Sequence, residues 1–169
     1  ITGLGTTDGT IDDASVMAFT SWRVATHALK GLRDAGFDID PGPAYFGVMR
    51  ELLVFLLCGI DRLAYARLGA EGRAPFTAAL VQREAEILRD NEADLLGPLE
   101  EGGDYADRFI DQFNALAPHY AEFDWSATEG PDFAFMRYLG NRLEPLLPEK
   151  DRRWVIEQLM LREAPEAVQ

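Results

Sequence analysis

Glu84 and Asn91 are polar residues at positions where helical periodicity calls for apolar ones, so they are the first candidates for binding a ligand. They stand seven residues apart, which places both on one side of a helix. The apolar residues of the same side are Phe76, Leu80, Ile87 and Leu95. A buried carboxylate is costly unless it is paired or protonated, so we expect an arginine from a neighbouring helix, Arg50 or Arg62, beside Glu84. Two interpretations stay open: a core ion pair that fixes helix register, or an acid of raised pKa in an interior pocket.

Cys58 is the second candidate, because Arg62 follows it by four residues and lies on the same helix face. A neighbouring guanidinium lowers the pKa of a thiol and favours the nucleophilic thiolate. The alternative is a small core residue, since a lone cysteine inside an apolar run usually has only a packing role.

Charges of opposite order frame that apolar run and suggest a self-complementary surface. Arg50 and Glu51 precede it, Asp61 and Arg62 follow it, and Phe55 and Cys58 lie on the stripe between them. If two copies packed antiparallel, Arg50 would face Asp61 of the partner subunit, as an isologous dimer requires. The interface expected from this pattern is Arg50, Glu51, Phe55, Cys58, Asp61 and Arg62. The alternative is that these charges pair with other helices of the same chain.

Three further polar residues are weaker candidates for ligand binding. His119 stands at the edge of an aromatic helix face, where a satisfied boundary histidine is the alternative to a general base. Arg137 and Tyr138 belong to a polar and aromatic cluster that would suit an anionic small molecule, and a hydrated helix face is the alternative.

Sequence motifs of known chemistry are missing from the chain. There is no glycine-rich phosphate loop, HExxH, CxxC or GxSxG sequence. A di-iron bundle needs two Glu-x-x-His pairs, whereas this chain has one His119-x-x-Glu122 in reversed order. We therefore assign no catalytic residue and expect neither a metal nor a cofactor.

Composition narrows the class of protein further. The net charge of −13, from 29 acidic and 16 basic side chains, argues against nucleic-acid binding, which depends on lysine and arginine. The apolar run Leu52–Ile60 is too short to cross a bilayer, because nine helical residues rise only about 14 Å. A single cysteine excludes an internal disulfide, and no signal-peptide pattern opens the sequence. We expect a cytoplasmic protein that binds no membrane.

Helical periodicity recurs along the chain, which predicts an all-α, single-domain bundle of about six helices around a buried, nearly all-apolar central helix. Residues 1–10 read as a flexible arm or tag remnant, and residues 11–169 as the domain. The predicted helices run from Asp12 or Asp13 to Asp34, then over 44–68, 75–96, 104–117, 131–144 and 149–162, with breaks at glycine and proline. Pro118 should kink or divide the fourth helix.

The function that these features favour is non-enzymatic: an acidic helical protein that self-associates, most simply as a homodimer, or binds a partner protein. The alternative is a small-molecule-binding bundle or small enzyme that uses a buried pocket of Glu84, Asn91 and an arginine. A polar cavity around Glu84 would favour this alternative.

Overall fold

The computed structural model describes residues 2–37, 39, 42–99, 102–126 and 130–147 as a mostly helical, single-domain protein. The helices are α1 (Thr2–Asp34), α2 (Pro43–Leu96), α3 (Tyr105–Ala121), α4 (Phe133–Leu143) and the 3₁₀ turn η1 (Glu144–Leu146). Two-residue strands β1 (Trp125–Ser126) and β2 (Gly130–Pro131) pair antiparallel between α3 and α4. The all-α prediction is confirmed in this part of the chain. The predicted helix over 149–162 lies outside the described residues.

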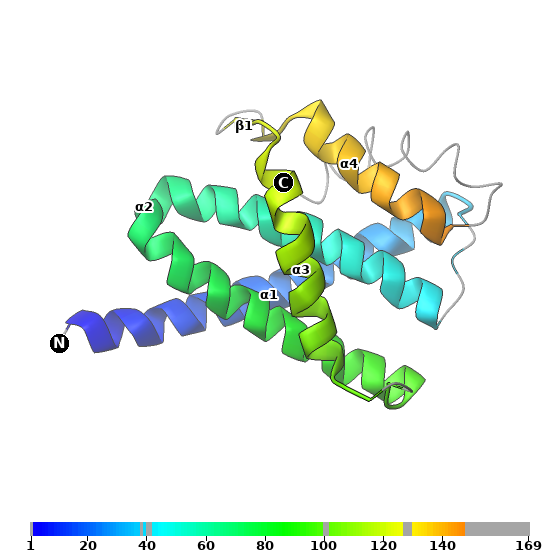
Figure 1. Ribbon diagram of the computed structural model, residues 1–169, viewed down its shortest axis with the longest axis horizontal. Coiled ribbons are helices and arrows are strands. Elements are labelled where there is room, and N and C mark those ends of the chain that lie inside the picture. Colours follow the sequence, from blue (N-terminus) through cyan, green and yellow to red (C-terminus); the bar gives the residue numbers. More distant parts are fainter. Residues whose placement is uncertain (1, 38, 40–41, 100–101, 127–129, 148–169) are drawn as a thin grey trace.

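A reversal at Gly69 divides α2 into two arms (Figure 1). Gly69 has φ 72° and ψ −179°, a backbone conformation that is open to glycine and strongly disfavoured for residues with a Cβ. Asp61 on the first arm accepts a hydrogen bond from Thr77 Oγ1 of the second arm at 2.6 Å. Arg73 Nε lies 3.3 Å from Asp61 Oδ1 in an ion pair, so polar contacts hold the two arms together beside the turn.

The other helices are arranged around this α2 hairpin. In Figure 1, α1 passes behind the two arms and α3 crosses in front of them, while α4 lies along the first arm. Both α1 and α3 pack mainly on α2 and hardly on each other. The hairpin is therefore the middle layer of the fold.

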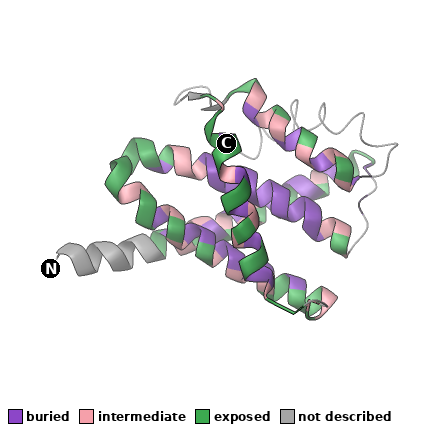
Figure 2. Ribbon diagram, viewed as in Figure 1, coloured by how far each residue is buried: buried purple, intermediate pink, exposed green. Residues whose placement is uncertain are grey.

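The middle of the first arm of α2 is buried on every side, as its apolar run predicts, and its end toward Gly69 is exposed (Figure 2). Residues 46–59 are all buried, including Phe55, which meets the rings of Tyr120 and Phe135 edge to face. Helix α1 contributes a face of mostly small residues, and the buried members include Ala14, Ala18, Ala25 and Leu32. Small side chains let α1 lie close to the hairpin.

Three predicted helix boundaries are wrong. Helix α1 begins at Thr2 and not at Asp12 or Asp13. The second arm of α2 begins directly after Gly69 and not at Pro75, which lies inside it. Helix α3 continues through Pro118 to Ala121. Its last turn is held from outside, because Arg62 donates to the carbonyl oxygens of Tyr120 and Ala121 at 3.1 and 2.8 Å. A cation at this end also favours the helix dipole.

Helix α2 is the one helix among the described residues that is long and apolar enough to cross a membrane by length and composition. Most of its apolar stretch, 78%, is buried inside the bundle. A core helix of a helical bundle has the same length and composition, so the stretch does not by itself identify a membrane segment.

We predict that Gly69→Ala destabilises the protein by about 1 to 3 kcal/mol, because alanine is strained at the φ of this turn. Chemical denaturation followed by circular dichroism measures the change. Ala70→Ser, at the exposed neighbouring position, is the control and should change the free energy of unfolding by less than about 0.5 kcal/mol. Equal stability of Gly69→Ala and the wild type would show that the chain turns without this conformation.

Candidate functional site

A cavity of about 780 Å³ lies where both ends of α2 meet the beginning of α3. Its wall combines the first turns of α2, the last turns of α2, the following loop and the first two turns of α3. The lining residues are Pro43, Arg50, Glu92, Leu96, Pro98, Leu99, Gly102, Gly103, Asp104, Tyr105, Asp107, Arg108 and Asp111. The volume is in the range of small-molecule sites.

A buried ion pair forms one wall of this cavity. Arg50 Nη1 on the first arm of α2 donates to Glu92 Oε1 on the second arm, and both side chains are almost fully buried. Glu92 Oε2 is enclosed and has no hydrogen-bond partner among the described residues. Arg50 itself also lines the cavity.

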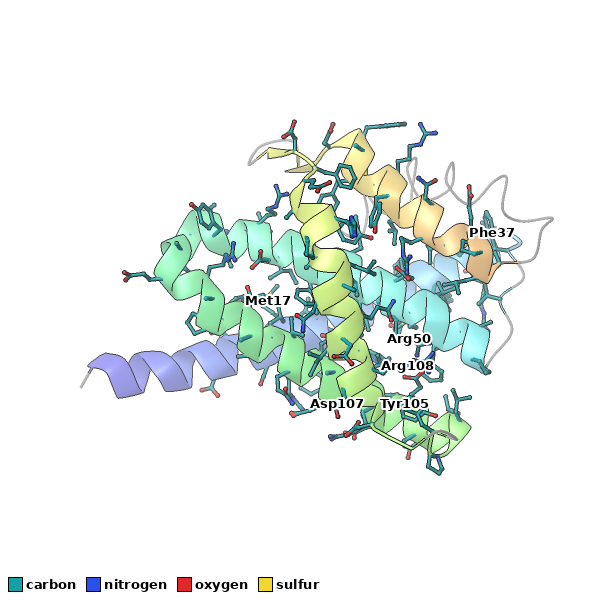
Figure 3. All side chains as sticks on the ribbon, viewed as in Figure 1. Met17, Phe37, Arg50, Tyr105, Asp107 and Arg108 are labelled. Atoms are coloured by element: carbon teal, nitrogen blue, oxygen red, sulfur yellow. The ribbon has the colours of Figure 1, made fainter. Side chains whose placement is uncertain are left out.

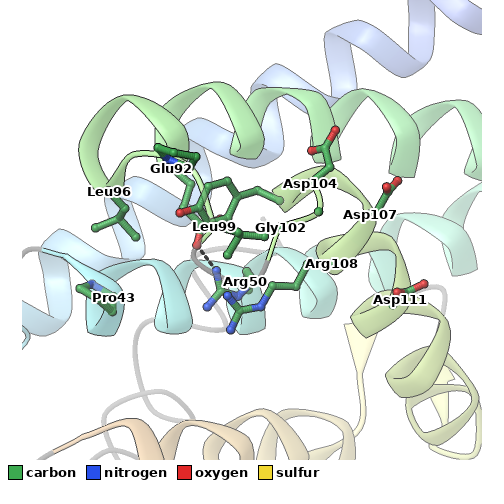
Figure 4. Close-up of a pocket in the computed structure, with 13 residues that line it drawn as sticks. Pro43, Arg50, Glu92, Leu96, Leu99, Gly102, Asp104, Asp107, Arg108 and Asp111 are labelled. Atoms are coloured by element: carbon green, nitrogen blue, oxygen red, sulfur yellow. Dashed lines mark hydrogen bonds and ion pairs between the residues drawn. The ribbon is translucent and has the colours of Figure 1, made fainter.

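A second guanidinium reaches the same wall from α3. Arg108 is exposed and makes no ion pair with any described residue. Figure 3 places Arg50 and Arg108 close together where α3 crosses α2, and Figure 4 shows the Arg108 side chain extending toward Arg50. Two arginine side chains from different helices therefore converge in one cavity.

Three aspartates stand near Arg108 at the beginning of α3 and also line the cavity (Figure 4). Asp104 caps α3, accepting a hydrogen bond from Ala106 N at 2.7 Å. Asp107 and Asp111 are exposed and stand one helical turn apart on α3. The described cavity wall therefore combines arginines and carboxylates from both α2 and α3.

The described residues that connect α2 to α3 include three glycines of positive φ and a contact from a tyrosine of α3. Gly97, Gly102 and Gly103 have φ values of 74°, 78° and 95°. Tyr105 Oη donates to the carbonyl oxygen of Gly97 at 2.8 Å, which ties the start of α3 to the end of α2. These glycines permit the turn that brings Asp104 and Arg108 opposite Glu92.

Glu84 is fully buried as predicted, but the arginine expected beside it is not there. Neither carboxyl oxygen has a hydrogen-bond partner among the described residues, because Arg50 pairs with Glu92 and Arg62 binds the end of α3. Burial raises the pKa of the Glu84 carboxyl from its ordinary value of 4.5 to about 9, and nearby Arg83 lowers it only in part. Glu84 is therefore a neutral acid near pH 7, and it does not line the cavity.

The prediction that Asn91 is buried is wrong. Asn91 is exposed and donates from Nδ2 to the carbonyl oxygen of Ile87 at 2.8 Å, and Leu95 of the same side is exposed too. No described element covers this side of the final turns of α2.

Of the weaker candidates, the structure brings two together. His119 and Tyr138 stack with ring centroids 5.9 Å apart and planes 24° apart, and His119 is exposed. Arg137 is exposed on α4 and does not take part in this stack. None of these three residues lines the cavity.

The charges that frame the apolar run of α2 all have partners inside the chain. Glu51 accepts hydrogen bonds from Arg142 Nη2 at 2.8 Å and from Gln112 Nε2 at 3.1 Å, so it links α2 to α4 and α3. Arg50, Asp61 and Arg62 pair as described above. Phe55 is 1% exposed. The alternative of pairing within one chain fits these contacts, and a second copy is not needed to cover the six stripe residues.

Cys58 is a buried core residue and not an activated thiol. Burial raises the pKa of its thiol to about 12, with Asp61 adding to the rise, and Arg62 opposes it only weakly. The reason is that Arg62 turns toward the carbonyl oxygens at the end of α3, including that of Phe123 at 2.6 Å.

Sequence reasoning missed Glu92 and Arg108. Glu92 directly follows Asn91, so the periodicity that placed Asn91 on the buried side of this arm pointed away from Glu92. Arg50, one of the two arginines expected beside Glu84, does pair with a buried acid of this arm. That acid is Glu92, about two helical turns after Glu84. Nothing in the local sequence distinguishes Arg108 from other exposed arginines.

Known proteins do not extend the description of this site. No protein-family model, no curated protein and no solved structure matches the chain. Among the described residues, no three His, Cys, Asp or Glu side chains are grouped as ligands for a metal ion.

We predict that the pH dependence of stability contains a component from Glu84. In the unfolded chain the carboxyl ionises near pH 4.5, whereas in the folded protein it stays protonated up to about pH 9. The folded state therefore binds the extra proton between these values, and its stability falls as the pH rises, by up to about 1.4 kcal/mol per unit. Urea denaturation of wild type and Glu84→Gln between pH 5 and 9 measures the difference, which should grow in favour of the variant. Parallel curves would contradict the neutral-acid assignment.

We also predict that Arg142→Leu destabilises the protein by about 1 to 3 kcal/mol, because Glu51 would remain buried with Gln112 as its only partner among the described residues. Thermal and chemical denaturation measure the loss, and Arg137→Leu on the same helix is the control. The double variant Glu51→Gln with Arg142→Leu should recover part of the stability, since it leaves no buried charge. Additive single effects would mean that the two side chains are not coupled.

Proposed function

We propose that this protein is a non-enzymatic, ligand-binding helical bundle that holds a small molecule in the cavity between α2 and α3. The observation that carries the proposal is the convergence of Arg50 and Arg108 in a cavity of about 780 Å³. Arg50 is fixed by Glu92, so one guanidinium is preorganised while the other is free to close on a ligand. In this proposal the polar pocket of the alternative sequence interpretation includes Glu92 instead of Glu84.

The residue types in the cavity wall are the reason to propose a binding protein and not an enzyme. The described lining residues supply carboxylates, guanidinium groups and apolar side chains, but no Ser, Thr, Cys, His or Lys. The single hydroxyl, that of Tyr105, is already engaged with the carbonyl oxygen of Gly97. A nucleophile activated by a base, the usual arrangement of covalent catalysis, is not supplied by this set.

We predict that the protein retains a small molecule that Arg108 helps to hold. The purified protein is incubated with the low-molecular-weight fraction of a cell extract, and native mass spectrometry records any adduct. An adduct should appear on the wild type and fall at least about tenfold in occupancy on Arg108→Gln, as expected for loss of a charged hydrogen bond. Arg137→Gln, which removes an exposed arginine outside the cavity, should keep it. No adduct, or an equal adduct on both variants, would contradict the proposal.

A second candidate function is self-association, the homodimer that the sequence favoured. The observation that favours it is a group of exposed apolar side chains at the end of the α2 hairpin: Leu63 is 45%, Tyr65 54% and Leu68 52% exposed. Exposed apolar groups at one end of a molecule are a common feature of association surfaces. This surface differs from the stripe around Phe55, which the chain covers itself.

We predict for this candidate that Leu68→Glu, alone or with Tyr65→Glu, shifts the protein toward the monomer. Light scattering after size-exclusion chromatography over a range of concentrations measures the mass. The control is Leu95→Glu, which places the same charge on a residue that is 72% exposed at the other end of the second arm. A wild type that stays monomeric at high concentration would rule out self-association.

A further inference from the structure

We propose that the ligand of this cavity is a monocarboxylate carried on an apolar chain, and that its carboxylate bridges Arg50 and Arg108. The residues that carry this inference, which rests on the proposed function, belong to α2, to α3 and to the described part of the connection between them. All of them line the cavity.

The path of the Arg108 side chain points to an anion. Asp104 and Asp111 stand four residues before and three residues after Arg108, at the spacings where opposite charges of one helix pair. Arg108 pairs with neither, and no ion pair joins it to any other described residue. Figure 4 shows Arg108 extending toward Arg50, whereas the aspartates point away from both. Because two guanidinium groups repel each other, this arrangement favours a negative group between them.

A single negative charge suits these two arginines. Arg50 already donates to Glu92, so this buried pair is compensated within itself. Arg108 then remains without a counter-charge among the described residues. A carboxylate supplies one negative charge and matches the planar fork of a guanidinium. A phosphate group carries close to two negative charges near pH 7, which is more than Arg108 alone compensates.

Apolar side chains of the same cavity are suited to a chain attached to the carboxylate. Leu96 and Leu99 line the cavity and are half-buried, so part of their apolar surface is open to a ligand. In Figure 4, Leu96 and Pro43 lie on the far side of Arg50 from α3. A ligand that ended at its carboxylate would leave this surface in water, whereas an apolar chain would cover it.

Four probes, compared on the intact protein by isothermal titration calorimetry, test the proposal. Octanoate has both the carboxylate and the chain. Acetate lacks the chain, octylammonium replaces the negative charge with a positive one, and octyl phosphate replaces the carboxylate with a phosphate. We expect octanoate to bind and each other probe to bind at least about tenfold more weakly, as expected for the loss of apolar burial or of a charged hydrogen bond.

Two substitutions assign the two halves of the ligand. Arg108→Gln should weaken octanoate binding at least about tenfold. Leu99→Ala should reduce the gain in affinity from acetate to octanoate. The matched controls are Arg137→Gln and Leu95→Ala, which change exposed residues outside the cavity and should bind octanoate as the wild type does. Circular dichroism and thermal denaturation check that each variant is folded.

The possible outcomes separate the ligand class from the proposed function. Octylammonium or octyl phosphate binding as tightly as octanoate would overturn the ligand class, and so would octanoate binding that Arg108→Gln leaves unchanged. Equal affinities for acetate and octanoate would overturn the role of the apolar chain. If no probe binds but the native mass spectrum shows an adduct that depends on Arg108, the ligand class is wrong and the proposed function stands. If neither a probe nor an adduct binds, both are wrong.

Discussion

The side chains of Leu52–Ile60 surround the first arm of α2 on every side, so the free energy of this fold depends on covering that arm completely. One neighbouring helix covers only part of a cylinder. The chain covers the rest by turning back on itself at Gly69, by laying α1 behind the hairpin and by crossing α3 in front of it. The positive φ of a single glycine thus permits the second arm to pack on the first. Helices α1 and α3 then pack on the hairpin that the two arms form.

Buried charges then fix how the helices meet. Glu51 joins three helices through Arg142 and Gln112, and Arg62 holds the last turn of α3 from the first arm. Removing one partner from such a contact leaves a desolvated group, which makes the observed register strongly preferred. Glu84 is the exception, since it is enclosed without a partner and stays neutral through its raised pKa. Because Glu84 is buried in its neutral form, the free energy of unfolding falls as the pH rises toward the pKa of this carboxyl.

The cavity lies where these elements end. Helix ends carry polar residues and glycine turns because the chain must leave the helix there, so the meeting of both ends of α2 with the start of α3 gathers Arg50, Glu92, Asp104 and Arg108. The opposite end of the hairpin exposes Leu63, Tyr65 and Leu68 instead. The molecule therefore has a polar cavity at one end of the hairpin and an apolar surface at the other, and each suits a different kind of partner.

The sequence by itself determined the helical class, the break at Gly69, and the burial of the apolar run of the first arm and of Glu84. These depend on local propensity and on periodicity, which a single helix already contains. Only the tertiary structure decided the partners. Arg50 pairs with Glu92 and not with Glu84, and Arg62 turns from Cys58 to the end of α3. Each of these contacts joins residues at least 42 positions apart in the chain. Periodicity says which side of a helix is buried, but the angle and offset at which two helices cross select the charges that meet.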